Sequence, residues 1–103
     1  MAAVLFTVRA TISADHEEAY NQWYHKEHCP QLLRFPGAVS ARRYKTILSD
    51  DEYQYMAIYE FESEETFDRF QESDHFKELL AEYDAKFGDV STRRRDAYVQ
   101  VWP

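Results

Sequence analysis

Two halves of this chain carry the same pattern of side chains at a constant spacing of 47 positions. The pattern covers a stretch that alternates like a strand and a stretch with the periodicity of a helix. The matched pairs are Phe6 and Tyr53, Val8 and Tyr55, Ala10 and Ala57, Tyr20 and Phe67, Trp23 and Phe70, His28 and His75, Leu32 and Leu79, and Leu33 and Leu80. Chance matching is the alternative, because 17% of the residues are aromatic. A constant spacing over both kinds of element favours a duplicated β-α-β unit.

Local signals divide the chain into six elements. Ser13 or Asp15 is expected to cap a first helix that ends near Glu27, because Pro30 cannot continue a regular helix. Gly88 is expected to end the second helix. The expected strands are residues 4–12, 38–48, 53–62 and 93–102, the expected helices are residues 13–27 and 63–87, and a hairpin turn is expected at residues 49–52.

The order β-α-β-β-α-β predicts an α+β domain of the ferredoxin-like type over residues 1–103, with a four-stranded antiparallel sheet and both helices on one face. Tyrosines and other apolar residues of the third strand are expected on one side, while Met56 and Ile58 lie on the other. The expected side contains Tyr53, Tyr55, Ala57, Tyr59 and Phe61. Apolar residues on both sides leave an open sheet face that needs a partner, which predicts a homodimer formed through that face.

Charge and cysteine content exclude several classes of partner. The net charge of −7 and the pI near 5.0 argue against binding to nucleic acid or to an anionic membrane. The short basic run from Arg93 to Arg95 is expected to be solvated or paired at the start of the last strand. A single cysteine, Cys29, suits a reducing cytoplasm, and no apolar run is long enough to cross a membrane.

The first helix carries the chain's main candidate site. Tyr20, Tyr24 and His28 are spaced four residues apart, with Trp23 beside them, so they share one helix face that must pack on the sheet. His28 is therefore expected to point inward at the helix end, whereas His25 lies closer to the polar side. Which of the two histidines is functional stays open at this point.

The second helix repeats this design. His75 shares the inner side of its helix with Phe67 and Phe70, so His28 and His75 are expected to line one cavity between helices and sheet. An imidazole in an apolar pocket exchanges protons near neutral pH, which makes His28 the candidate general base and His75 a second catalytic group. The alternatives are a buried His28 bonded to backbone and an interfacial His75 where the helix bends.

Other side chains are candidates for holding a substrate. Tyrosine hydroxyls can bind a polar aromatic ligand, and one of the neighbouring residues Arg42 and Arg43 is expected to point inward and to hold a carboxylate or enolate. The substrate-binding candidates are Tyr20, Trp23, Tyr24, Arg43 and Tyr55. A His-x-x-His pair alone is a weak metal signal, so we expect no metal and no cofactor.

Two segments carry a family resemblance. Residues 23–44, WYHKEHCPQLLRFPGAVSARRY, resemble the segment of EthD-like proteins in which a helix ends in His-x-Pro and is followed by Pro-Gly and a strand reaching Arg-Tyr. Residues 70–83, FQESDHFKELLAEY, are similar to the second helix of the dimeric α/β-barrel superfamily, which includes small antibiotic-biosynthesis monooxygenases. The resemblance implies a homodimer whose two sheets form a barrel, with a cavity in each subunit between sheet and helices.

This combination leads to two functional hypotheses. The first is an enzyme that acts on an aromatic, polyketide-like or lactone small molecule by His-assisted proton transfer, as a cofactor-independent isomerase, cyclase or monooxygenase. The second is a non-catalytic small-molecule-binding or stress-response dimer that uses the same cavity. An enzyme requires a polar group within reach of the ligand's reactive atom, whereas a binder is expected to have an apolar, filled or shallow cavity.

Overall fold

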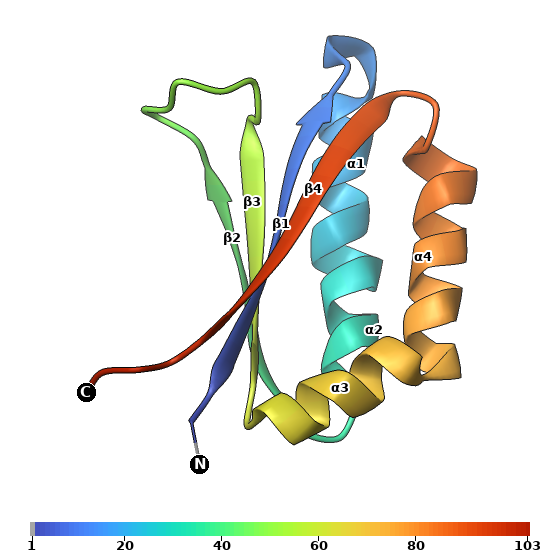
Figure 1. The fold of residues 1–103 in the computed structure, drawn as a ribbon. Coiled ribbons are helices and arrows are strands. Elements are labelled where there is room, and N and C mark those ends of the chain that lie inside the picture. The colour runs from blue at the N-terminus through green and yellow to red at the C-terminus, as the bar shows by residue number, and fades with distance from the viewer. Residues whose placement is uncertain (1) are drawn as a thin grey trace.

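The structure is a computed structural model that describes residues 2–103. A four-stranded antiparallel sheet has the order β2-β3-β1-β4, and the helices pack on one of its faces (Figure 1). The strands are β1 (Val4–Ile12), β2 (Ala38–Lys45), β3 (Tyr55–Phe61) and β4 (Ser91–Val99); the helical elements are the 3-10 turn η1 (Ala14–His16), α1 (Glu17–Trp23), the π-helical turn η2 (Tyr24–His28), α2 (Cys29–Leu33), α3 (Glu64–Glu72) and α4 (Asp74–Phe87). The expected ferredoxin-like α+β fold is confirmed.

The core lies between the sheet and the helices. The central strands β1 and β3 pair with a register in which Phe6 lies opposite Tyr59 and Val8 opposite Ala57. These side chains alternate toward the helices and are buried with the aromatic faces of α1 and α4. The predicted inward stripe of the first helix is confirmed, since Tyr20 and Tyr24 are buried in the same core.

The first helical segment was expected to end near Glu27. It continues instead to Leu33. In a regular α-helix, Pro30 would lack a hydrogen bond and would clash with the carbonyl group four residues earlier. The π-turn η2 removes this conflict because its bonds span five residues: the Cys29 N–H donates to the Tyr24 carbonyl. Pro30 then lies in the first turn of α2, where it is tolerated.

The second helical segment is broken where one continuous helix was expected. Ser73 has an extended backbone, with ψ of 154°, and separates α3 from α4. Its hydroxyl accepts a hydrogen bond from the Phe76 N–H at 3.1 Å and donates to the Phe70 carbonyl at 2.6 Å. The serine thus caps α4 and also closes the end of α3. The predicted end of the segment before Gly88 is confirmed, because α4 ends at Phe87.

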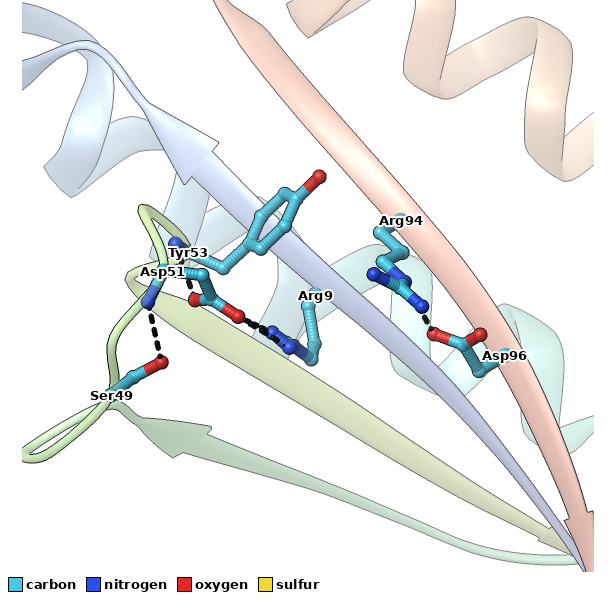
Figure 2. A network of polar contacts seen from close by, with 6 residues as sticks. All are labelled: Arg9, Ser49, Asp51, Tyr53, Arg94 and Asp96. Carbon is cyan, nitrogen blue, oxygen red and sulfur yellow. Dashed lines mark hydrogen bonds and ion pairs between the residues drawn. The ribbon is translucent and has the colours of Figure 1, made fainter.

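Tyr53 does not share the helix-facing side of the third strand, contrary to the expectation. It precedes β3, and its ring lies 5.0 Å from the guanidinium carbon of Arg9. Arg9 also donates to Asp51 at 2.7 Å, and the Tyr53 N–H donates to the same carboxylate at 3.1 Å. Figure 2 shows this network, which ties the β2–β3 loop to β1 on the open side of the sheet.

The open sheet face is mixed and not simply apolar. Ala97 and Val99 of β4 lie opposite Phe6 and Val4 on the helix-facing side and do not contribute to the open face. Charged pairs lie on the open face, including Arg94 with Asp96, both on β4, at 3.1 Å (Figure 2). The face carries Leu5, Thr7, Arg9 and Thr11 from β1, Arg42 and Tyr44 from β2, Met56 and Ile58 from β3, and Arg94, Asp96 and Tyr98 from β4.

Candidate functional site

A small cavity lies beside His28, between the sheet and the helices. Its volume of about 20 Å³ is room for about one water molecule. Both helical segments and three strands contribute to its wall. The polar lining residues are Tyr24, His28, Tyr59, Arg93 and Arg95, and the apolar ones are Phe6, Val8, Leu32, Phe76, Leu79 and Leu80.

His28 is the buried titratable group of this cavity, with 6% of its surface exposed. Its ring stacks on Trp23 with 4.5 Å between ring centres and meets the edge of Tyr24 at 4.8 Å. Among residues 2–103, Nδ1 of His28 has no hydrogen-bond partner. The side chain is therefore held by aromatic packing and keeps one ring nitrogen unused.

The surroundings of His28 favour the neutral imidazole. Burial, together with the positive charges of Arg93 and Arg43, lowers its pKa from 6.5 to about 4. The histidine is consequently unprotonated at neutral pH. An uncharged imidazole that lines a cavity can accept a proton from a bound molecule at its unprotonated nitrogen.

Two arginines of β4 reach the same cavity. The strand register places Arg93 opposite Ala10 and Arg95 opposite Val8, so both point toward the helices. The Arg93 guanidinium carbon lies 3.5 Å from the ring centre of Tyr83. No ion pair engages Arg95 within the part of the chain that the structure describes. The expectation that this basic run is solvated or paired is confirmed, since Arg93 pairs with Asp84 at 3.4 Å, Arg94 pairs with Asp96 at 3.1 Å and Arg95 is exposed. The position of Arg93 and Arg95 beside the cavity was not expected from the sequence.

Arg43 organises a second group of aromatic residues next to the cavity. It is the inward-pointing member of the pair with Arg42, as one of the two was expected to be. Its Nη1 donates to Oδ1 of Asn21 at 2.7 Å and lies 3.2 Å from Nε2 of His25. The guanidinium carbon lies 4.3, 5.0 and 5.7 Å from the ring centres of Tyr24, Tyr55 and Tyr20. These cation–π contacts hold a buried positive charge behind the wall of the cavity.

Buried tyrosines supply neutral hydroxyl groups around the site. Tyr20 and Tyr83 share a hydrogen bond of 2.7 Å, and Tyr83 lies 2.8 Å from Oγ of Ser91. Burial, with the nearby Tyr83, raises the pKa of Tyr24 to about 12. Burial also raises the pKa of Tyr59 well above its ordinary value. Because their pKa values are raised, Tyr24 and Tyr59 stay protonated at neutral pH. Both line the cavity, so their hydroxyls can donate hydrogen bonds there.

The sequence-predicted site residues do not all meet in one place. Of those proposed from sequence, only His28 and Tyr24 line the cavity. Trp23 contacts His28, and Tyr20 and Arg43 contact Tyr24, without lining the cavity themselves. Tyr55 contacts Arg43.

His75 does not share the cavity of His28, contrary to the expectation. It lines a different hollow of about 170 Å³ together with Gln31, Glu78 and Glu82. Its Nε2 lies 2.7 Å from the carbonyl oxygen of Gln31, so it joins α4 to α2. The break at Ser73 places His75 at the start of a new helix and turns it away from the cavity.

Two other chemistries find little support. Burial raises the pKa of the Cys29 thiol, which keeps it protonated and poorly nucleophilic. Residues 2–103 contain no group of three or more histidine, cysteine or acidic side chains arranged to hold a metal ion.

Within residues 2–103, no helix combines the length and apolar character needed to cross a membrane.

The sheet order and the one-sided helices define a ferredoxin-like domain, the fold that an EthD family protein also has. The chain belongs to a family described as a domain of unknown function, DUF4286, whose pattern matches residues 3–97. The resemblance noted from the sequence is thereby confirmed at the level of the fold. No curated protein matches the chain in sequence.

Solved structures share the fold at low sequence identity. A DABB family protein from Mesorhizobium loti has a TM-score of 0.75 and 13% identity, covering 99% of this chain and all of its own. An EthD family protein from Bacillus halodurans has a TM-score of 0.68 and 15% identity, with coverage of 93% and 97%. SnoaB, a cofactor-independent oxygenase from Streptomyces nogalater, has a TM-score of 0.67 and 18% identity, with coverage of 100% and 97%.

Proposed function

We propose that this protein is a cofactor-independent enzyme that moves a proton on an aromatic, polyketide-like or lactone compound, with His28 as the general base. The observation that carries the proposal is a buried, neutral His28 that lines a cavity and whose Nδ1 has no hydrogen-bond partner among residues 2–103. The likeness in fold to a cofactor-independent oxygenase agrees with this chemistry.

The proton transfer follows from the charges around the cavity. The unprotonated ring nitrogen of His28 takes a proton from a carbon next to a carbonyl group, or from a phenol, and the bond's electron pair moves onto the substrate oxygen. Arg93 and Arg95 stabilise the resulting anion, while a hydroxyl of Tyr24 or Tyr59 orients it. The developing negative charge also raises the pKa of the histidine, so imidazolium and enolate form as a pair.

The fate of the enolate sets the reaction type. Return of the proton to another atom completes an isomerisation, and attack on a second carbonyl group completes a cyclisation. Transfer of its electrons to dioxygen would make the reaction an oxidation. The first two need no co-reactant, and His28 returns to its neutral form after each turnover.

Replacement of His28 tests this function. The His28→Ala variant is expected to lose at least about a hundredfold in turnover on a panel of aromatic ketones and lactones, because a general base contributes that much or more. His75→Ala is the matched control, since it removes the equivalent side chain from a different hollow. Circular dichroism verifies that both variants fold. Undiminished turnover by folded His28→Ala would refute the assignment.

One observation favours the second candidate, a non-catalytic binding dimer. The cavity beside His28 has room for about one water molecule, as expected of a filled pocket that performs no chemistry. In either case we propose a cytoplasmic homodimer joined through the open face, where Leu5, Met56 and Ile58 stand among the charged pairs. Sedimentation of the purified chain measures the dimer directly.

A further inference from the structure

The cavity beside His28 adjoins a larger hollow that opens between β4 and the helices α3 and α4. This outer hollow has a volume of about 230 Å³, and Phe67, Gln71 and Ala97 are among its lining residues. Phe6, Phe76 and Arg95 line both spaces. The two spaces are therefore neighbours on either side of the same side chains.

One aromatic side chain forms much of this partition. Phe76 is only partly buried, and its ring centre lies 4.8 Å from that of Phe70 and 6.2 Å from that of Phe6. It stands near the start of α4, three residues after the break at Ser73. Because the side chain of Phe76 contributes to this partition, its torsions alone move it and the backbone stays in place.

The charge at this junction is unbalanced. The outer hollow includes one acidic lining residue, Asp96, and its carboxylate is bonded to Arg94 at 3.1 Å. Arg95 has neither an ion pair nor a side-chain hydrogen bond among residues 2–103. Arg95 is exposed and lines the outer hollow together with Phe67 and Phe76. An unpaired guanidinium at the edge of an aromatic hollow suits a flat molecule that carries a carboxylate, because arginine binds carboxylates through two parallel hydrogen bonds.

We infer that the two spaces form one binding site for an aromatic carboxylate. The ring of the ligand lies in the outer hollow between Phe67 and Phe76, its carboxylate binds Arg95, and its reacting end reaches the ring of His28 once Phe76 has turned. This inference rests on the proposed function and specifies its substrate class. It also makes Arg95 the residue that selects the substrate by charge.

The test compares two flat probes of equal size, 2-naphthoate and its uncharged analogue 2-naphthamide. Isothermal titration is expected to show at least about tenfold tighter binding of 2-naphthoate, since hydrogen bonds to charged groups contribute that much. Arg95→Gln is expected to abolish the preference. Arg42→Gln, which makes the same charge change on the open face, is the control and is expected to keep it.

Amide NMR shifts of the unmodified protein provide a second measurement that needs no variant. Addition of 2-naphthoate is expected to shift the amides of Gln71, Phe76 and Ala97. Equal binding of the two probes, binding of neither, or shifts confined to other regions would overturn the inference. Failure of the proposed function looks different: His28→Ala would then retain turnover, whatever the charge preference measured at Arg95.

Discussion

The two helical segments at matching positions of the repeat meet the sheet in different ways. The first continues from Glu17 to Leu33 through a π-turn, whereas the second is cut at Ser73 into two helices. Their equivalent histidines consequently have different surroundings. His28 is buried beside the cavity with its Nδ1 unpaired, while His75 is bonded to the Gln31 carbonyl in another hollow.

This difference shows that a repeated side-chain pattern does not guarantee a repeated site. The direction of each histidine depends on where its helix departs from regular geometry. The departure is the π-turn η2 in the first half and the break at Ser73 in the second half. Each irregularity can be removed separately, the π-turn by deletion of one of its residues and the break by replacement of Ser73.

The largest effect is expected from deletion of Lys26, an exposed residue of the π-turn. Shortening the turn by one residue rotates the later residues of this helical segment by about 100° around the helix axis. Leu32 then leaves the core, and we expect a loss of about 3–5 kcal/mol in the free energy of unfolding. Urea denaturation measures it, with Lys26→Ala as the length-preserving control. An unchanged midpoint for the deletion would show that η2 does not fix the register.

The pH dependence of stability distinguishes the two histidines next. The folded-state pKa of His28 is lowered to about 4, so the unfolded chain binds a proton there first as the pH falls. Stability is lost between the unfolded pKa near 6.5 and the folded pKa, by about 2–3 kcal/mol at pH 4.5. We expect His28→Gln to lack this part of the loss between pH 7.5 and 4.5, and His75→Gln to retain it. Equal slopes in all three proteins would contradict the buried neutral state.

A smaller effect is expected from Ser73→Ala, which removes the cap that separates α3 from α4. The variant loses the bonds to the Phe76 N–H and to the Phe70 carbonyl. Caps of this kind contribute about 1–2 kcal/mol, and thermal unfolding measures the difference. Ser73→Asp, which can still accept the N–H bond, is expected to recover part of it. A variant as stable as the parent would place the cause of the break elsewhere.

The smallest effect is expected from His75→Gln. It weakens the bond between α4 and α2 at the Gln31 carbonyl, which corresponds to about 0.5–1 kcal/mol of stability. Turnover is expected to change less than about threefold, because His75 lies outside the cavity. A loss of turnover as large as that of His28→Ala would bring His75 back into the site.

Much of the fold follows from the sequence because its strongest signals are local. The strict alternation from Val4 to Ile12 predicted the first strand with its observed bounds. The inward face of the first helix followed from the spacing of its aromatic residues. By contrast, the continuation past Pro30 was missed, because the rule that proline ends a helix holds for a regular α-turn and not for a π-turn.

The site was harder to predict because it depends on which elements meet. The break at Ser73 had a local signal, a serine followed by an acidic residue, but the apolar periodicity continued across it. Arg95 belongs to a charged run, and its direction became clear only from the register of β4 against β1. The partition by Phe76 depends on tertiary packing that no short pattern encodes.

The stack of Trp23 on His28 gives the protein an optical reporter of its own site. A protonated imidazole lying against an indole quenches its fluorescence, and these two rings are nearly parallel, at 24°, with centres 4.5 Å apart. The chain has one other tryptophan, Trp102, which is 84% exposed and contributes a background from solvent. Emission from the buried indole therefore follows the charge of the histidine, so proton transfer in the cavity can be watched without any added label.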